Sequence, residues 1–196
     1  MEPARQTFQR LGPDSRTQSL IEACARVLAT KGASGASVRA ICAEAGVSPG
    51  LLTHYFSGVN ALVAATYEAT GVAVEAALEA AVQSEKAPRA QLIAYLTASF
   101  RAPVSDPALL ATWLAFWSLA RTDLAIAALH MRIYGGYRAR LEQLITACAP
   151  GDQRLTAIGL TALVDGLWLE LSLGDAPFSA DDAAAIVEHW VEMSGI

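Results

Sequence analysis

Two short helical segments joined through a glycine constrain the fold of this chain more than any other feature. Residues 37–56 read SVRAICAEAGVSPGLLTHYF. Ser37 is placed to cap a first helix, and Gly46 supplies the left-handed residue that ends it. Ser48 is placed to cap a second, short helix in which Pro49 takes the first position, where its missing N–H costs nothing. This order of caps and stops predicts a helix-turn-helix motif.

Similar signals divide the rest of the chain into helices. An apolar stripe at helical spacing predicts a helix over 15–31, capped by Asp14 or Ser15 and followed by the turn GASGA. Breaks that contain Pro or Gly separate further helices at 58–84 (capped by Ser57), 88–101, 106–121, 123–148, 152–173 and 179–194. Ala and Leu are abundant and few segments read as strands, so we predict an all-α fold.

Composition favours a large core and argues against several classes of protein. Hydrophobic residues make up 54% of the 196 residues and charged residues only 17%, which argues against disorder. There is no uninterrupted apolar run of about 18 residues, and residues 1–13 lack the apolar segment of a signal peptide. We therefore expect no membrane span. The odd number of cysteines, Cys24, Cys42 and Cys148, without metal spacing, favours reduced thiols in a cytoplasmic protein.

We recognise no catalytic motif and no metal-binding motif in the sequence. There is no recognisable nucleophile with its base and no pair of acid and base groups, so we do not expect an enzyme. His130 and His189 have no neighbours at ligand spacing, so we expect no metal and no cofactor.

The helix-turn-helix points to double-stranded DNA, because the second helix of such motifs lies in the major groove. Small residues at its start let the backbone approach base edges, and Thr53, His54 and Tyr55 can bond to phosphate. Leu52 and Phe56, one turn apart, are expected to face inward. The residues expected to contact DNA are Ser37, Val38, Arg39, Ser48, Pro49, Gly50, Leu51, Thr53, His54 and Tyr55.

Charge is distributed unevenly along the chain, although its net value is −5. Residues 1–60 carry six Lys or Arg against four Asp or Glu, whereas residues 61–196 carry eight against 15. A mildly basic end on an acidic body suits a single DNA-facing surface. Residues 1–13 are predicted to be a flexible tail, in which Arg5 and Arg10 either touch DNA as an arm or stay solvated.

The stretch GVSPGLLTHYF, together with SVRAICAEAG before it and Leu62 after it, resembles the TetR family of repressors. The resemblance covers about residues 14–74. It implies an N-terminal three-helix helix-turn-helix domain at 14–60 and a C-terminal helical domain at 61–196 for ligand binding and dimerisation. TWLAFWSLA at 112–120 and LVDGLWLELSLGD at 163–175 are similar to the BetI-like branch, which implies a choline-responsive repressor.

One departure from the family concerns the start of the fourth helix. The family often has a phosphate-binding lysine there, whereas this chain has Val59. The loss of one phosphate contact lowers the salt slope of DNA binding by about one unit. An alternative function follows from this change, namely a protein-interaction module with weakened DNA binding.

Aromatic residues and one carboxylate suggest an effector site. Trp113 and Trp117 share a helix face, and Asp165 shares another with Trp168 inside an apolar run. Aromatic faces with a carboxylate suit a quaternary ammonium ion such as choline. The candidate ligand-binding residues are Trp113, Phe116, Trp117, Tyr134, Asp165 and Trp168, and Tyr137 is a further contributor. The alternatives are a plain core, with Asp165 paired to Arg132, Arg138 or the partner subunit, and an apolar or aromatic effector.

The last two predicted helices carry features of a dimer interface. Gly159, Ala162 and Gly166 permit close helix approach, and residues 186, 190 and 193 are apolar at helical spacing. In the TetR family these helices form a four-helix bundle with their symmetry mates. A homodimer on a palindromic operator would double the bases read by one short recognition helix. The full expectation is a dimeric repressor that a small effector releases from DNA.

Overall fold

The structure is a computed structural model that describes the backbone of residues 13–196 and the side chains from Ser15 onward. Within that range it contains α-helices and one short 3-10 turn but no strand, so the all-α prediction is confirmed. The elements are α1 (Pro13–Gly35), α2 (Val38–Ala45), α3 (Pro49–Tyr55), α4 (Val59–Gln83), α5 (Pro88–Thr97), η1 (Ala98–Phe100), α6 (Pro107–Ala120), α7 (Leu124–Cys148), α8 (Arg154–Leu173) and α9 (Ala180–Met193). The predicted tail, with Arg5 and Arg10, lies outside the described residues except for Pro13, which begins α1.

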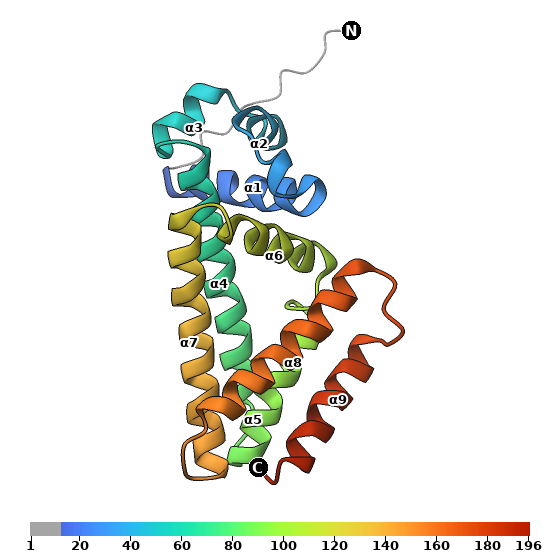
Figure 1. The fold of residues 1–196 in the computed structure, drawn as a ribbon. Coiled ribbons are helices and arrows are strands. Elements are labelled where there is room, and N and C mark those ends of the chain that lie inside the picture. Colours follow the sequence, from blue (N-terminus) through green and yellow to red (C-terminus); the bar gives the residue numbers. More distant parts are fainter. Residues whose placement is uncertain (1–12) are drawn as a thin grey trace, which may run out of the picture.

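The helices form a small N-terminal group on top of a longer helical body (Figure 1). Helices α1, α2 and α3 make up the group, and α4 runs from it down the length of the body beside α7. Helix α6 packs against α1 on one side and against α7 and α8 on the other. The interior of the body is therefore linked to the N-terminal group through both α4 and α6.

The signals at the ends of α1 and α2 act largely as the sequence predicts. Gly32 takes a left-handed conformation (φ 65°) that interrupts α1, after which one more helical turn reaches Gly35. Ser37 caps α2 by accepting a hydrogen bond from the Ala40 N–H at 3.2 Å. Gly46 ends α2 in the left-handed region (φ 65°, ψ 34°), so the predicted turn chemistry is confirmed.

Three predicted caps are wrong. The Ser48 hydroxyl makes no capping bond, because the Leu51 N–H that it would accept donates to the Ser48 carbonyl at 3.0 Å. Ser57 does not cap α4, because Gly58 (φ 146°) takes the cap position without a side chain to offer. Asp14 and Ser15 lie inside α1 and not at its cap position, since the helix already begins at Pro13.

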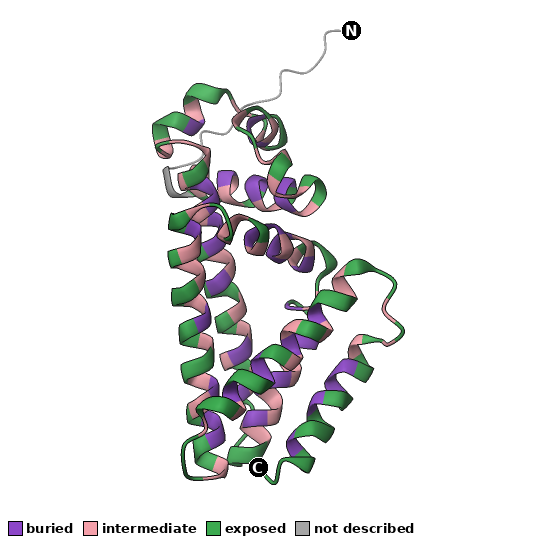
Figure 2. Cartoon of the chain, in the orientation of Figure 1, coloured by how far each residue is buried: buried purple, intermediate pink, exposed green. Residues whose placement is uncertain are grey.

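A continuous hydrophobic core runs from the N-terminal group into the body (Figure 2). Leu28 of α1, Leu52 of α3 and Leu62 of α4 are fully buried at the upper end, and Phe116 of α6 is fully buried where the two parts meet. Full burial of side chains of this size stabilises the fold by about 1.5–3 kcal/mol each. The two parts therefore share one packed interior.

Two of the helices are apolar along much of their length. By length and composition alone, α4 and α8 could each cross a membrane. In this fold α4 packs against α1, α5 and α7, and α8 packs against α6, α7 and α9. These contacts account for part of their apolar composition, because 28% of the most apolar window of each helix is buried.

Candidate functional site

The helix-turn-helix residues form the outer surface of the N-terminal group. Those that are exposed to solvent are Ser37, Arg39, Ser48, Pro49, Gly50, Thr53 and His54. Val38, Leu51 and Tyr55 are half-buried, and the ring of Tyr55 packs on the core with an edge contact to His54. Leu52 is buried and Phe56 is packed on the core, as expected for the inward face of α3.

Three details bear on how this surface could contact a nucleic acid. Arg26 of α1 pairs with Glu44 of α2 at 2.7 Å, which ties the two helices together, whereas Arg39 makes no ion pair within the described chain. The Thr53 hydroxyl donates to the Gly50 carbonyl at 3.1 Å and must leave that bond to donate to a phosphate. Val59 begins α4 and is half-buried against the core, so this position carries no charge.

The helical body encloses a cavity of about 170 Å³ among α4, α5, η1, α6, α7 and α8. Its deep wall is mostly aromatic and buried, and it consists of Tyr95, Ser99, Trp113, Tyr134, Val164 and Trp168. Trp113 and Trp168 meet edge to face, with ring centroids 6.0 Å apart. Such a wall offers both ring faces and a few polar atoms to a small ligand.

The hydroxyl of Tyr134 is the centre of a hydrogen-bond network in this wall. It accepts from the indole N–H groups of Trp113 at 3.1 Å and Trp117 at 3.0 Å. It donates to Asp165 Oδ1 at 3.1 Å. The indole N–H of Trp168 donates instead to the Ser99 carbonyl at 2.7 Å. Two helices, α6 and α8, are thus joined through one phenol of α7, and the indole rings are held in fixed orientations.

Asp165 is a half-buried carboxylate without an ion pair within the described residues. Arg132, a predicted partner, pairs with Glu68 at 2.6 Å. Arg138, the other, stacks over the Tyr134 ring at 5.5 Å and reaches Asp165 only through its longer-range charge. Burial raises the pKa of Asp165 to about 6, although the Tyr134 hydrogen bond and the Arg138 charge act in the opposite direction. A bound cation would favour the ionised form.

The structure brings four of the six candidate ligand-binding residues together. Trp113, Tyr134, Asp165 and Trp168 all line the cavity, whereas Phe116 and Trp117 do not. Phe116 stacks on Tyr67 in the core, with ring centroids 4.1 Å apart. Trp117 acts on the cavity only through its bond to Tyr134, which lies between it and Asp165.

Several cavity residues are missed by reasoning from the sequence. Tyr95 and Ser99 lie on α5 and η1, where Tyr95 shares a stripe with Leu92 and Leu96 that reads as ordinary core. Glu75 and Gly136 line the cavity from α4 and α7, and Tyr137 does so as expected. Helical periodicity shows which residues share a face, but not which neighbouring helix that face meets.

His130 does not line the cavity. The Tyr67 hydroxyl and His130 Nδ1 lie 2.8 Å apart, so His130 is a half-buried structural residue. Burial and the charge of Arg138 lower the pKa of His130. In the described part of the chain, no group of three or more His, Cys, Asp or Glu residues could hold a metal ion.

Comparison with known proteins identifies the family. Residues 20–66 match the description "Bacterial regulatory proteins, tetR family", and residues 88–194 match "BetI-type transcriptional repressor, C-terminal". The regulator BetI of Proteus mirabilis (strain HI4320) is 31% identical over 186 residues, which cover 91% of this chain and 90% of that protein. BetI of Pectobacterium carotovorum (strain PC1) is 34% identical over 185 residues, with 90% and 92% covered.

The solved structures agree with this comparison. A transcriptional regulator from Pseudomonas aeruginosa PAO1 shares 42% identity with a TM-score of 0.87, covering 96% of this chain and 94% of its own. A regulator from Saccharomonospora viridis in complex with choline has the same fold at 17% identity, with a TM-score of 0.82 and coverage of 91% and 96%.

The chain therefore belongs to the TetR family of bacterial transcriptional regulators. Within that family it is of the BetI type, a ligand-responsive regulator and not an enzyme. The family resemblance seen in the sequence and the prediction of a non-enzymatic regulator are both confirmed. DNA-binding regulators of this family act in the cytoplasm, which agrees with the location predicted from the cysteines.

Proposed function

We propose that this protein is a homodimeric repressor that binds a palindromic operator and is released by a quaternary ammonium effector. Residues 14–60 form the DNA-binding domain, and residues 61–196 bind the effector and the second subunit. The exposed start of α3, with Ser48, Pro49 and Gly50, supports this role, because small residues allow close approach to base edges. Two copies related by a twofold axis present two such helices to the two half-sites.

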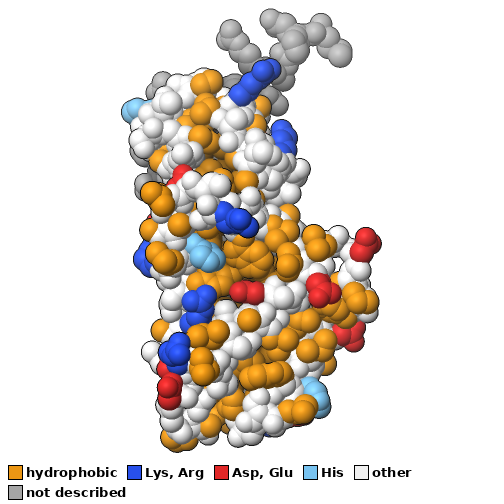
Figure 3. Space-filling model, in the orientation of Figure 1, with side chains coloured by type: hydrophobic (Ala, Val, Ile, Leu, Met, Phe, Trp, Pro, Cys, Tyr) orange, Lys and Arg blue, Asp and Glu red, His pale blue; other side chains and the backbone are white. Residues whose placement is uncertain are grey.

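The dimer is supported by an exposed apolar face on the last two helices. Figure 3 shows hydrophobic side chains gathered over α8 and α9. The larger exposed ones are Leu155, Ile158, Leu169 and Leu173 on α8 and Ile186, Trp190 and Met193 on α9. Gly159 and Gly166 lie exposed among those of α8, and neither has any neighbour within 4 Å of a built Cβ. A second subunit could therefore approach the α8 backbone closely.

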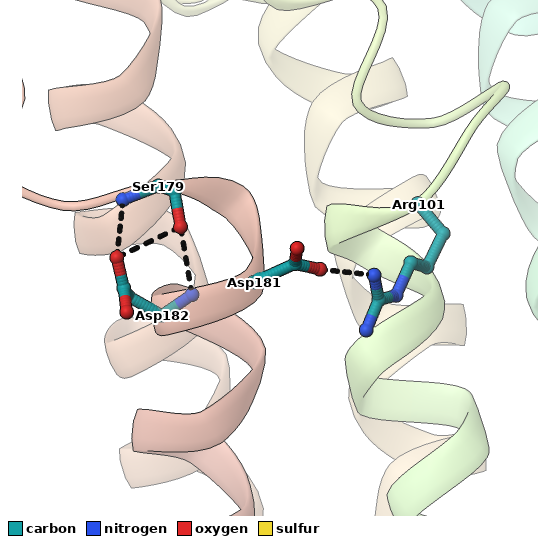
Figure 4. Close-up of polar contacts among 4 residues, drawn as sticks. All are labelled: Arg101, Ser179, Asp181 and Asp182. Atoms are coloured by element: carbon teal, nitrogen blue, oxygen red, sulfur yellow. Dashed lines mark hydrogen bonds and ion pairs between the residues drawn. The ribbon is translucent and has the colours of Figure 1, made fainter.

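The start of α9 is fixed by polar contacts (Figure 4). Ser179 and Asp182 form a capping box, in which Ser179 accepts from the Asp182 N–H and Asp182 accepts from the Ser179 N–H. Arg101, just after η1, forms an ion pair with Asp181. These contacts satisfy polar groups of the first turn of α9 and tie the start of the helix to the segment after η1.

The effector class is inferred from the cavity. Trp113, Trp168 and Tyr134 offer aromatic rings around the unpaired carboxylate of Asp165. A cation over such rings gains about 2 kcal/mol or more when both are removed from water. A purely apolar effector would bury Asp165 further without a partner, which is costly. The structure of the S. viridis regulator in complex with choline supports this choice of effector.

Effector binding can reach the DNA-binding domain through α6. Trp113 of α6 lines the cavity, and the adjacent Thr112 donates from its hydroxyl to the Ala25 carbonyl of α1 at 3.2 Å. Tyr67 of α4 packs against both Trp113 and Phe116. A ligand that prefers one arrangement of these rings would shift α1 and α4, and with them the spacing of the two α3 helices.

The unpaired carboxylate of Asp165 carries this proposal, and Asp165→Asn tests it. Tryptophan fluorescence titration with choline chloride should give at least a tenfold weaker Kd in the variant than in the wild type. Asp175→Asn, an exposed carboxylate beyond the end of α8, is the matched control and should bind normally. Choline should also release the wild type from its promoter DNA in a gel-shift assay. Equal binding by Asp165→Asn, or release by apolar compounds but not choline, would contradict the proposal.

A further inference from the structure

The cavity opens to solvent along the seam between α4 and α7. Five of its lining residues are exposed, and all five belong to these two helices: Glu68, Val72, Glu75, Arg132 and Gly136. The lining residues contributed by α5, η1, α6 and α8 are buried or half-buried. The cavity is therefore deep on the side of Trp113 and Trp168, and its mouth lies on the opposite side.

Two ion pairs frame this mouth. At one end of the mouth, Arg132 Nη2 lies 2.6 Å from Glu68 Oε1. At the other end, Arg140 binds Glu79 through two contacts, Nε to Oε1 at 2.6 Å and Nη2 to Oε2 at 2.9 Å. Both pairs hold α4 against α7, so the helices can be kept at a constant distance while the space between the pairs stays open.

Glycine leaves the centre of the mouth unobstructed. Gly136 lies one helical turn after Arg132 and one before Arg140, on the same face of α7. A Cβ built at Gly136 meets no atom within 4 Å, so the space beside this glycine is open. A larger side chain at this position would occupy that space. Gly135, its neighbour, is exposed as well but does not line the cavity.

Glu75 supplies an uncompensated charge at the mouth. It lies on α4 between Glu68 and Glu79, and unlike both it has no ion-pair partner within the described chain. The Glu75 charge is also felt inside the cavity, because it adds to the effect of burial in raising the pKa of the buried Tyr95. A cation approaching the seam would thus meet one free carboxylate outside and a second, Asp165, inside.

We propose that the effector enters and leaves through the α4–α7 seam, and that Glu75 increases the rate at which cationic effectors are captured. This inference rests on the proposed function in taking the effector to be a cation. A side chain that narrows the route slows association and dissociation equally and leaves Kd unchanged. Loss of the Glu75 charge lowers the association rate mainly at low salt, where attraction over long distances is least screened.

Stopped-flow tryptophan fluorescence with choline chloride tests the route. Gly136→Leu should reduce both rate constants at least tenfold and change Kd by less than twofold. Gly135→Leu is the matched control, since it adds the same side chain one position away, and its rates should be those of the wild type. Unchanged rates in Gly136→Leu, or a weakened Kd with normal association, would overturn the proposed route.

The charge is tested in the same assay with Glu75→Gln. Association should slow by roughly three- to tenfold at low ionic strength, and the difference should vanish at high salt. Glu85→Gln, an exposed carboxylate outside the cavity, should behave as the wild type. A salt-independent loss in Glu75→Gln would overturn the role given to its charge. Absence of choline binding to the wild type would overturn the proposed function and this inference together, whereas binding with unaltered variant rates overturns this inference alone.

Discussion

The carboxyl group of Asp165 accepts one hydrogen bond, from Tyr134, in a largely buried position. Burial raises its pKa from 3.8 to about 6. Between these two values the folded protein holds the proton more tightly than the unfolded chain does. The free energy of unfolding therefore falls as the pH rises from about 4 to 6, by about 3 kcal/mol in total, and stays lower at neutral pH.

Asp165→Asn should consequently stabilise the ligand-free protein at neutral pH. We expect the free energy of unfolding to rise by about 2–3 kcal/mol at pH 7.5, and by much less at pH 4.5, because an amide mimics the protonated carboxyl. Urea unfolding of wild type and variant at both pH values measures the difference. If Asp165→Asn instead lowers the free energy of unfolding equally at both pH values, Asp165 stabilises the fold through its bond to Tyr134, and its charge does not destabilise the ligand-free protein.

Single residues of the site are foreseen from the sequence only where their chemistry is unusual for their surroundings. Asp165 stands out because a carboxylate in an apolar helix needs a reason, and Trp113 stands out by its spacing from Trp117. Tyr95 and Glu75 carry no such signal, since the first continues an ordinary apolar stripe and the second is one of three glutamates on its helix. Their roles depend on how α4 and α5 pack, which no local pattern specifies.

At the scale of helices, the breaks follow directly from the sequence. Pro88, Pro107 and Gly174 mark helix ends within a residue or two of their predicted positions, because the ring of proline and the left-handed conformation of glycine act locally. Caps are less predictable. A serine before a helix offers a hydroxyl, but its usual donor can be engaged elsewhere: after Ser48 the Leu51 N–H donates to the Ser48 carbonyl.

The two serines of the motif allow this difference to be measured. Ser37→Ala removes an observed cap and should lower the free energy of unfolding by about 1 kcal/mol, whereas Ser48→Ala should leave it unchanged within about 0.5 kcal/mol. Thermal or urea unfolding of both variants checks the stability. Ser48→Ala should nevertheless weaken operator binding if its exposed hydroxyl contacts a phosphate. A larger loss of stability in Ser48→Ala than in Ser37→Ala would contradict the observed capping geometry.

For the whole molecule, the sequence indicates the number of helices and the two-part organisation, but not the cavity. The cavity exists because α4 and α7 run side by side while α8 crosses the body, so that these helices face one space together with α5, η1 and α6. The same packing turns one stripe of α8 toward the cavity, at Val164, Asp165 and Trp168, and leaves Leu169 and Leu173 exposed. The proposed effector cavity and the proposed dimer face thus share helix α8.

If the exposed apolar face of α8 and α9 joins the two subunits, a change on this face should weaken both subunit association and operator binding. Ile186→Glu places a charge on this face and should convert the proposed dimer to monomers in sedimentation experiments. Operator affinity should fall at least a hundredfold, because a single α3 would read only one half of the proposed palindromic site. Met131→Glu, on the exposed side of α7, is the matched control. Met131 is 69% exposed and lies outside the α8–α9 face, so Met131→Glu should leave the oligomeric state and the operator affinity unchanged. Fluorescence titration should show that monomeric Ile186→Glu still binds choline, because no residue of α9 lines the cavity. A folded Ile186→Glu protein that remains dimeric would locate the subunit interface elsewhere.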